Sequence, residues 1–278
     1  MGNLNSVSET ALFTLMARVC EAEKQDPIIF DTQGIEILTK LKFLVSSDFS
    51  KKLLEKKLPP TLTNYLALRA RKFDLYTKAF IKRKGGLVVS LGSGFDTRYW
   101  RIADPKLNYL EIDLPEVIQI KKVLFEEEPP YEMIGRSVLD DQWIEMISSR
   151  QTENILFLAE GLLMYLNEID AIDLFKRLSE VFSNSEMVFE VINKKYTQGM
   201  WKKVVMSKMK RRFGTEAGAS YNYGISYAKE IESYASNIRV LEEWSHFEEP
   251  DIVPRFQRYL RKFKLFSRTQ WTIRARIE

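Results

Sequence analysis

The chain has 278 residues, a net charge of +4, one cysteine and one histidine. This length suits one α/β domain with added elements, and an apolar content of 45% provides for a substantial core. One cysteine excludes an internal disulfide and predicts a reducing, cytoplasmic location. Cys20 and His246 are too few ligands for a zinc site, and the chain lacks the run of about eighteen apolar residues that a membrane span needs.

Residues 1–84 are predicted to form a helical N-terminal cap. Apolar residues recur at helical spacing in three segments of this region. Pro27 ends the first segment, and a basic turn followed by two glycines ends the third. The three predicted helices cover residues 6–19, 35–43 and 61–84.

Residues 85–192 alternate between short apolar runs and helical patterns. This alternation predicts βαβ units with right-handed crossovers and a mostly parallel sheet. The predicted strands are Leu87–Leu91, Tyr109–Ile112, Tyr131–Ile134, Ile155–Ala159 and Met187–Ile192. The predicted helices between them are Pro115–Phe125, Asp141–Ser149 and Glu168–Phe182.

Residues 193–237 break this alternation, because they are basic and aromatic and contain glycine. We expect them to form a helical insert, or lid, after the fifth strand. Residues 238–278 are predicted to complete the sheet. They contain two further strands, Ile238–Leu241 and Trp271–Ile277, separated by a helix at Pro254–Phe266.

A glycine turn and an acid at neighbouring strand ends predict a nucleoside site. The first strand ends in Gly92-Ser93-Gly94, and the next ends in Glu111-Ile112-Asp113. Such glycines let the backbone approach a ligand, and the acid binds ribose hydroxyls. Thr97 replaces the third glycine of GxGxxG, so a nucleoside without phosphates, S-adenosylmethionine, fits better than a dinucleotide. The alternative is an ordinary glycine turn in a βα unit.

Candidate binding residues also follow the third predicted strand and close the fourth. Ser137 and Val138 follow the third strand, and Glu160 closes the fourth. Because the carboxyl ends of parallel strands meet at one edge of a sheet, we expect these residues to lie near the glycine turn. The alternatives are a helix cap for Asp113, ahead of Pro115, and a solvated strand end for Glu160.

Three longer motifs resemble the leucine carboxyl methyltransferase superfamily. They are LGSGFDTR at 91–98, EIDLPEVI at 111–118 and AEGLLMYL at 159–166. The entry helix at 8–18, YGI at 223–225 and EEWS at 242–245 are similar to the bacterial, tetracenomycin-type polyketide O-methyltransferase branch. The resemblance spans nearly the whole chain. It implies a Rossmann-like, seven-stranded class I methyltransferase sheet with an antiparallel last strand, and S-adenosylmethionine as the cofactor.

The resemblance also implies positions for the cofactor. Gly92 and Gly94 would pack against it, Asp113 would bind the ribose hydroxyls, and Glu160 would contact the methionine end or the ribose. An arginine before the first strand would grip the methionine carboxylate, since a guanidinium fork suits a carboxylate.

Arg71 is the best match to this arginine, with Arg69 as a near alternative. Ser137 stands where the family often has an acid that contacts adenine. A hydroxyl or backbone group at Ser137 and Val138 would take over this contact. Asp96 is expected to cap the helix that follows the glycine turn.

We therefore expect an enzyme, an S-adenosylmethionine-dependent O-methyltransferase that acts on a small-molecule hydroxyl or carboxylate. The alternative is a non-catalytic nucleoside-binding or interaction protein with the same fold. The sulfonium activates the methyl group, so the protein needs mainly to align the acceptor and exclude water. No catalytic residue is assigned. Tyrosines at the fourth strand end and in the insert line the acceptor pocket or merely pack: Tyr165, Tyr221, Tyr223 and Tyr227.

The basic and aromatic run at 201–212 leaves the acceptor open. It fits a lid for an acidic small molecule or a protein C-terminus, an RNA contact, or a solvated helix face. We expect a small-molecule or carboxylate-bearing acceptor, and no nucleic-acid, metal or membrane partner. The oligomeric state stays open.

Overall fold

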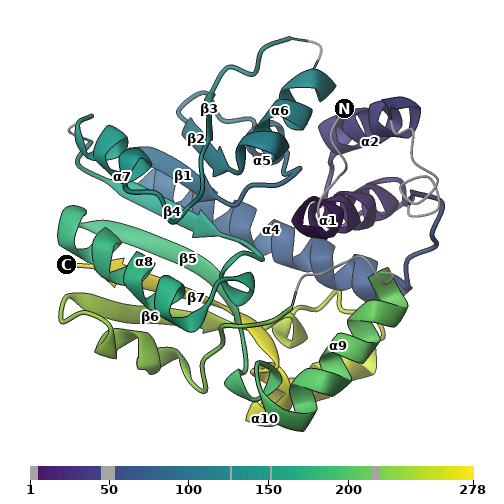
Figure 1. Ribbon diagram of the computed structural model, residues 1–278. Helices are drawn as coiled ribbons and strands as arrows, with labels where there is room; N and C mark the ends of the chain where they lie inside the picture. Colours follow the sequence, from purple (N-terminus) through teal and green to yellow (C-terminus); the bar gives the residue numbers. More distant parts are fainter. Residues whose placement is uncertain (1–5, 45–53, 126, 151, 214–219) are drawn as a thin grey trace.

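The computed structural model describes the chain except residues 1–5, 45–53, 126, 151 and 214–219. Within the described residues a seven-stranded sheet has the order β3-β2-β1-β4-β5-β7-β6 (Figure 1). Its strands are β1 (Leu87–Leu91), β2 (Asn108–Asp113), β3 (Glu132–Gly135), β4 (Ile155–Ala159), β5 (Ser185–Ile192), β6 (Ile238–Trp244) and β7 (Gln270–Ile277). Strands β1 to β5 pair in parallel, whereas β7 runs antiparallel to β5 and β6. The predicted α/β fold with an antiparallel last strand is confirmed.

Helices cover both faces and one edge of this sheet (Figure 1). The α-helices are α1 (Ser6–Ala22), α2 (Thr32–Leu44), α4 (Pro60–Arg83), α5 (Arg98–Ile102), α6 (Pro115–Leu124), α7 (Asp141–Ser148), α8 (Glu168–Val181), α9 (Gly199–Phe213) and α10 (Lys264–Ser267). Short 3₁₀ helices are η1 (Leu163–Tyr165), η2 (Lys194–Tyr196), η3 (Ala228–Ser233), η4 (His246–Glu248) and η5 (Arg255–Lys262).

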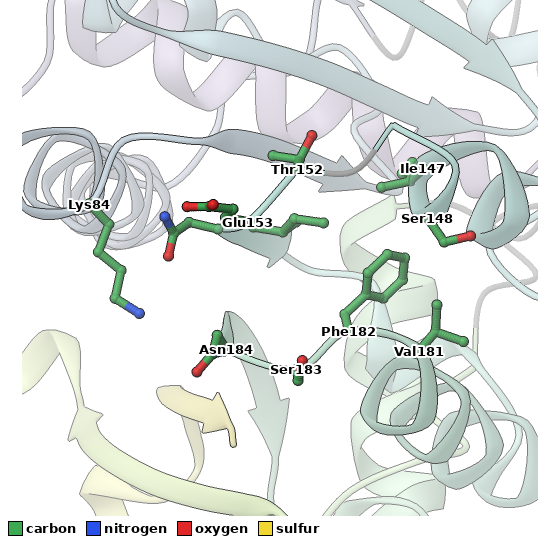
Figure 2. Close-up of a pocket in the computed structure, with 11 residues that line it drawn as sticks. Lys84, Ile147, Ser148, Thr152, Glu153, Val181, Phe182, Ser183 and Asn184 are labelled. Atoms are coloured by element: carbon green, nitrogen blue, oxygen red, sulfur yellow. The ribbon is translucent and has the colours of Figure 1, made fainter.

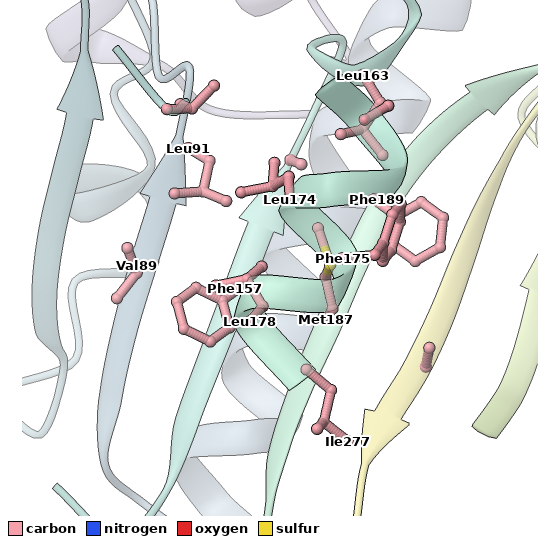
Figure 3. Packing of buried hydrophobic residues seen from close by; sticks show 14 of the residues in the cluster. Val89, Leu91, Phe157, Leu163, Leu174, Phe175, Leu178, Met187, Phe189 and Ile277 are labelled. Carbon is pink, nitrogen blue, oxygen red and sulfur yellow. The ribbon is translucent and has the colours of Figure 1, made fainter. Parts of the chain in front are cut away.

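The main hydrophobic core lies between the sheet and helices α7 and α8. Figure 3 shows the part of this core that packs against α8. Val89 and Leu91 of β1 and Phe157 of β4 belong to the same buried cluster as Leu174 and Leu178 of α8. Every residue of β1, β4 and β5 is buried, because helices cover both faces of these central strands. The sequences of β1 and β4 are accordingly apolar almost throughout, whereas β5 contains the buried glutamates Glu186 and Glu190.

The opposite face of the sheet packs on the long helix α4. Phe73 and Phe80 of α4 form a second buried cluster with Val88 of β1 and Leu156 of β4. Side chains alternate between the two faces of a strand, so neighbouring residues of β1 serve different cores. Helix α4 therefore runs beneath the strands that carry the site (Figure 1).

The N-terminal helices α1 and α2 form a third cluster beside the carboxyl ends of β1 and β2. Leu12 and Met16 of α1 and Ile37 of α2 pack in one group with Phe95 and with Ile118 of α6. Ala11 of α1 comes so close to the glycine turn that a Cβ added at Gly94 would lie 2.9 Å from its Cβ. Helix α1 thus covers the edge of the sheet at which the nucleoside site is expected.

Three predictions are corrected by the structure. Tyr131 precedes β3 instead of opening it, because its ring packs against those of Tyr99 and Tyr109. The helix predicted at 254–266 is a 3₁₀ helix followed by the single α-helical turn of α10. The insert is only partly helical, since Ile225 forms a bridge to Asn193 in extended conformation.

The packing of α8 generates a stability test. Leu174→Ala removes a fully buried side chain and should lower the free energy of unfolding by about 2–5 kcal/mol, since a cavity remains. Ile169→Ala on the same helix changes a side chain that is 81% exposed, so its effect should stay within about 0.5 kcal/mol. Urea unfolding of both variants checks this, and equal losses would contradict the assignment of the buried face.

Candidate functional site

A cavity of about 950 Å³ lies at the carboxyl ends of the parallel strands. All residues predicted to bind the cofactor, apart from Arg71, line it: Gly92, Gly94, Asp113, Ser137, Val138 and Glu160. Helix α1 also contributes to its wall, through Ala11, Thr14 and Arg18. The cavity thus combines the strand ends with the N-terminal helices.

The glycine turn after β1 leaves room only for a residue without a side chain. Gly92 has a φ of +61°, a region that favours glycine, and an added Cβ would lie 2.7 Å from Cδ1 of Leu162. The buried Ser93 hydroxyl has no hydrogen-bond partner among the described residues. An unpaired hydroxyl on a cavity wall is available to a ligand.

Asp113 closes β2 and is held by two backbone N–H groups. Gly94 N donates to Oδ2 at 2.6 Å, and Leu114 N donates to Oδ1 at 2.7 Å. Burial raises the pKa of the Asp113 carboxyl, and these two N–H groups oppose the rise. Each oxygen of an ionised carboxylate has a second lone pair, so Asp113 can still accept hydrogen bonds from a ligand. The N-cap of α6 is Leu114, with no side-chain cap, so the capping alternative for Asp113 is wrong.

Arg69, not Arg71, lies at the cavity. The two residues are two positions apart on α4 and so point roughly 200° away from each other. Arg69 lines the cavity and donates from Nε to Glu160 and from Nη1 to Glu190, at 2.8 and 2.7 Å. Arg71 instead pairs with Glu249 and Asp251, both at 2.8 Å. The prediction that favoured Arg71 therefore does not match its position in the structure.

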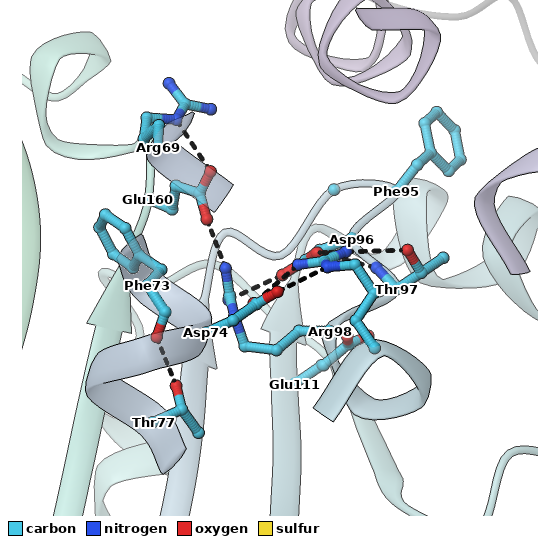
Figure 4. Close-up of polar contacts among 12 residues, drawn as sticks. Arg69, Phe73, Asp74, Thr77, Phe95, Asp96, Thr97, Arg98, Glu111 and Glu160 are labelled. Carbon is cyan, nitrogen blue, oxygen red and sulfur yellow. Dashed lines mark hydrogen bonds and ion pairs between the residues drawn. The ribbon is translucent and has the colours of Figure 1, made fainter. Parts of the chain in front are cut away.

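A buried network of charges connects the site residues (Figure 4). Arg98 reaches Glu160 at 2.5 Å, Asp96 at 2.7 Å and Asp74 at 2.9 Å. Glu160 lies between Arg98 and Arg69, and these two guanidiniums outweigh the effect of burial and hold the pKa of Glu160 below its usual range. The DTR motif therefore contributes Asp96 to the cavity wall and holds Glu160 in place through Arg98.

The same network extends to the N-terminal helices. Asp31 accepts hydrogen bonds from Arg18 Nε at 2.9 Å and from the Thr97 hydroxyl at 2.5 Å. Arg101 pairs with Asp96 at 2.9 Å. Asp96 does not cap α5 through its side chain, because α5 begins after Thr97 and has no side-chain cap. Asp96 therefore serves as an ion-pair partner of Arg98 and Arg101 instead of the expected helix cap.

The other part of the cavity is lined by three tyrosines, a methionine and a glutamine. Tyr65, Met164, Tyr165, Tyr221 and Gln270 contribute there, and the rings of Tyr165 and Tyr221 have centroids 5.7 Å apart. The remaining two tyrosines considered for an acceptor pocket do not line the cavity. Tyr223 is buried and Tyr227 is mostly exposed.

Sequence reasoning missed the pair formed by Tyr65 and Glu190. The Tyr65 hydroxyl donates a short hydrogen bond to Oε1 of Glu190, and burial raises the pKa of the Glu190 carboxyl. A signal existed, because a glutamate inside the fully buried strand β5 needs a partner. The identity of that partner depends on α4, which is far away in the sequence.

A second hollow of about 580 Å³ lies at the opposite edge of the sheet (Figure 2). Lys84, Glu153, Asn154 and Asn184 line it, near the amino ends of β1, β4 and β5. Ligands of open parallel sheets bind at the carboxyl ends of strands, so this hollow is not the candidate site.

Within the described residues, no group of His, Cys, Asp and Glu side chains is placed to hold a metal ion. No helix in that part of the chain combines the length and apolarity required to cross a bilayer. The basic and aromatic run at 201–212 lies in helix α9. There Trp201 is exposed and the Lys202 ammonium donates to Asn222, whereas the side chains of residues 208 to 213 lie outside the described part of the structure.

Comparison with known families identifies the chain. The family model for leucine carboxyl methyltransferase matches residues 11–179. The chain belongs to the leucine carboxyl methyltransferase family. This confirms the predicted family, and with it an S-adenosylmethionine-dependent methyltransferase. The alternative of a non-catalytic protein is not favoured.

Individual relatives of this methyltransferase agree. It is 28% identical over 255 residues to the tetracenomycin polyketide synthesis O-methyltransferase of Streptomyces glaucescens, covering 89% of this chain and 86% of the relative. It is 26% identical over 197 residues to an S-adenosyl-L-methionine-dependent methyltransferase of Gibberella zeae, covering 68% of this chain and 65% of that protein. A DUF574 family protein from Streptomyces avermitilis has the same fold, with a TM-score of 0.57 at 11% identity, covering 96% of this chain and 97% of that chain.

His246 does not line the cavity of this methyltransferase and is packed among rings. Its ring centroid lies 4.6 Å from that of Tyr65 and 4.0 Å from that of Phe247. Burial lowers the pKa of His246 from 6.5 to about 4. The folded state therefore favours the neutral imidazole.

This burial predicts a pH dependence of stability. Since the pKa is lower in the folded than in the unfolded state, the stabilisation is complete above pH 6.5 and is lost as the pH falls toward 4. Between pH 7 and pH 5 the wild type should lose about 1–2 kcal/mol more than His246→Phe, which keeps the ring contacts without the titration. Urea unfolding at both pH values measures the difference. Equal losses in the two proteins would show that other groups titrate.

Proposed function

We propose that this protein transfers a methyl group from S-adenosylmethionine to a hydroxyl or carboxylate oxygen of a small acceptor. One observation carries the proposal: a single cavity joins the glycine turn and Asp113 to a region lined by tyrosines. Its volume of about 950 Å³ suits a nucleoside cofactor beside an acceptor. The Streptomyces glaucescens relative is an O-methyltransferase of polyketide synthesis, which supports oxygen as the accepting atom.

The residues around the glycine turn fit the nucleoside part of the cofactor. Asp113 has lone pairs for two ribose hydroxyls, and Gly92 lets the ligand approach the backbone. Ser137 and Val138 follow β3 on the same wall, where the adenine ring would lie. Thr97 is buried and hydrogen-bonded to Asp31, so the turn does not continue as a pyrophosphate loop.

Arg69 is placed to bind the methionine carboxylate. Its Nε and Nη1 are used by Glu160 and Glu190, whereas its Nη2 has no hydrogen-bond partner among the described residues. A Cβ added at Gly161 would lie 3.3 Å from Nη1 of Arg69, so the backbone there approaches the guanidinium closely. A fixed guanidinium with a remaining N–H pair is suited to a carboxylate.

The bound cofactor supplies a methyl group already activated by its sulfonium. The protein residues then align the acceptor oxygen and exclude water. The Tyr65 hydroxyl donates a hydrogen bond to Glu190, so a lone pair of the Tyr65 oxygen can face a hydroxyl acceptor. As the methyl group is transferred, the acceptor's proton would pass to the Tyr65 oxygen and the Tyr65 proton would pass to Glu190. A carboxylate acceptor needs no base.

The proposal is tested by calorimetric titration with S-adenosylhomocysteine. The wild type should bind it and should not bind NADH. Asp113→Ala should weaken binding by about 1–3 kcal/mol, because charged hydrogen bonds to the ribose are lost. Asp104→Ala, which changes a loop before β2 at the opposite edge, serves as the control. NADH binding without S-adenosylhomocysteine binding would reject the proposed function.

The assignment of the arginine is tested with two variants on one helix. Arg69→Gln should weaken S-adenosylhomocysteine binding about 10- to 100-fold through loss of a charged hydrogen bond, whereas Arg71→Gln should leave it unchanged. 5′-Methylthioadenosine lacks the methionine carboxylate, so Arg69→Gln should bind it as the wild type does. Equal weakening for both ligands would mean that Arg69 acts only through the fold.

A further inference from the structure

The segment Val253–Phe266, which lies within the connection from β6 to β7, exposes a group of large apolar side chains. Phe256 is 66% exposed, Tyr259 71%, Phe263 59% and Leu265 65%. Exposed apolar residues are ordinary when scattered singly, but a contiguous group indicates an interaction surface. Nothing in the proposed methyl transfer uses these side chains.

The side chains of η5 form three ridges along the helix, because residues three positions apart lie above one another in a 3₁₀ helix. One ridge consists of Arg255, Arg258 and Arg261. The next contains the aromatic rings of Phe256 and Tyr259. The third ridge contains Leu260, which packs on a buried cluster and so holds the segment on the protein. The cluster consists of Leu68, Trp244, Phe247 and Ile252. The exposed rings are therefore not needed to hold η5 on the protein.

All charged residues of the segment Val253–Phe266 are cations. No aspartate or glutamate occurs between Asp251 and Glu278. Five cations form no ion pair with any residue that the structure describes, while a sixth, Arg268, pairs with Glu243 at 2.9 Å. The five are Arg255, Arg258, Arg261, Lys262 and Lys264.

This charge argues against a second copy of the chain as the partner. A two-fold interface would place the same cationic ridge against itself, and like charges would repel. An anionic partner is favoured instead. Guanidiniums bind phosphate through paired hydrogen bonds, so a surface of phosphate groups fits the arginine ridge.

We propose that the segment Val253–Phe266 docks this protein on an anionic phospholipid surface. Cations beside exposed phenylalanine and leucine are typical of interfacial binding, in which apolar side chains enter the headgroup boundary. Leu265 and Val253 have no ring to stack on a base, so a nucleic acid would leave them unused. Such docking is peripheral and needs no spanning helix.

The docking surface lies at the same edge of the sheet as the cavity. The segment follows the carboxyl end of β6 and leads to Gln270, which opens β7 and lines the cavity. Docking would therefore bring this edge near the lipid headgroups. The proposal stands independently of the acceptor's identity.

Cosedimentation of the full chain with vesicles tests the proposal. At about 0.1 M salt the protein should bind equimolar phosphatidylglycerol–phosphatidylcholine vesicles, and the binding should weaken as salt is raised. Arg255→Gln/Arg261→Gln/Lys262→Gln should reduce binding about 100-fold, since each cation near an anionic surface contributes about 1 kcal/mol. The matched control Lys78→Gln/Lys82→Gln/Lys106→Gln removes three exposed lysines that lie away from the segment and should bind as the wild type does.

A second variant and two further probes keep the partner class open to refutation. Phe256→Ser/Leu265→Ser should also weaken vesicle binding at least tenfold with unchanged thermal unfolding, because both side chains are exposed. Equal binding to pure phosphatidylcholine vesicles would overturn the proposal. Binding to a single-stranded oligonucleotide without vesicle binding, or a dimer that the Phe256→Ser/Leu265→Ser variant dissociates, would also overturn it.

Discussion

The site depends on a buried ion-pair network around Arg98 and Glu160. Charges removed from water cost several kcal/mol each unless they are paired and hydrogen-bonded, so the partners must hold one arrangement. The single side chain of Arg98 contacts three carboxylates: Asp74 of α4, Asp96 after β1 and Glu160 at the end of β4. Through Asp31 and Arg18 the same network reaches the N-terminal helices. It therefore holds together the elements that form the cavity, and it gives the residues of the DTR motif a structural role.

This arrangement separates structural from binding roles along helix α4. Asp74 and Arg69 face the network and the cavity, whereas Arg71 turns toward the loop after β6. The wall of the cavity carries both signs of charge: the carboxylates are Asp96, Asp113 and Glu160, and the cations are Arg18, Lys56, Lys57 and Arg69.

The strands were predictable where the physical signal is local. β1 and β4 begin and end at the predicted residues, because helices cover both faces and every position is buried. Predictions failed where packing or backbone geometry competes with pattern, as at Tyr131, which joins an aromatic cluster, and at Pro254–Phe266, which forms mainly a 3₁₀ helix. The glycine turn and Asp113 carry their signal in adjacent residues, so this end of the cavity could be inferred without coordinates.

The sequence by itself determined the α/β class, the strand order of appearance, the family and the residues at the strand ends. These follow from periodicity and from short motifs, in which the informative residues are neighbours. Only the tertiary structure decided that Arg69 and not Arg71 faces the cavity and that Glu190 pairs with Tyr65. It also decided that the cations of the segment Val253–Phe266 form no ion pair with any described residue. Each of these depends on which side chains meet across elements far apart in the chain. A buried charged group needs an oppositely charged partner close to it in space, and the sequence order does not show which residue that is.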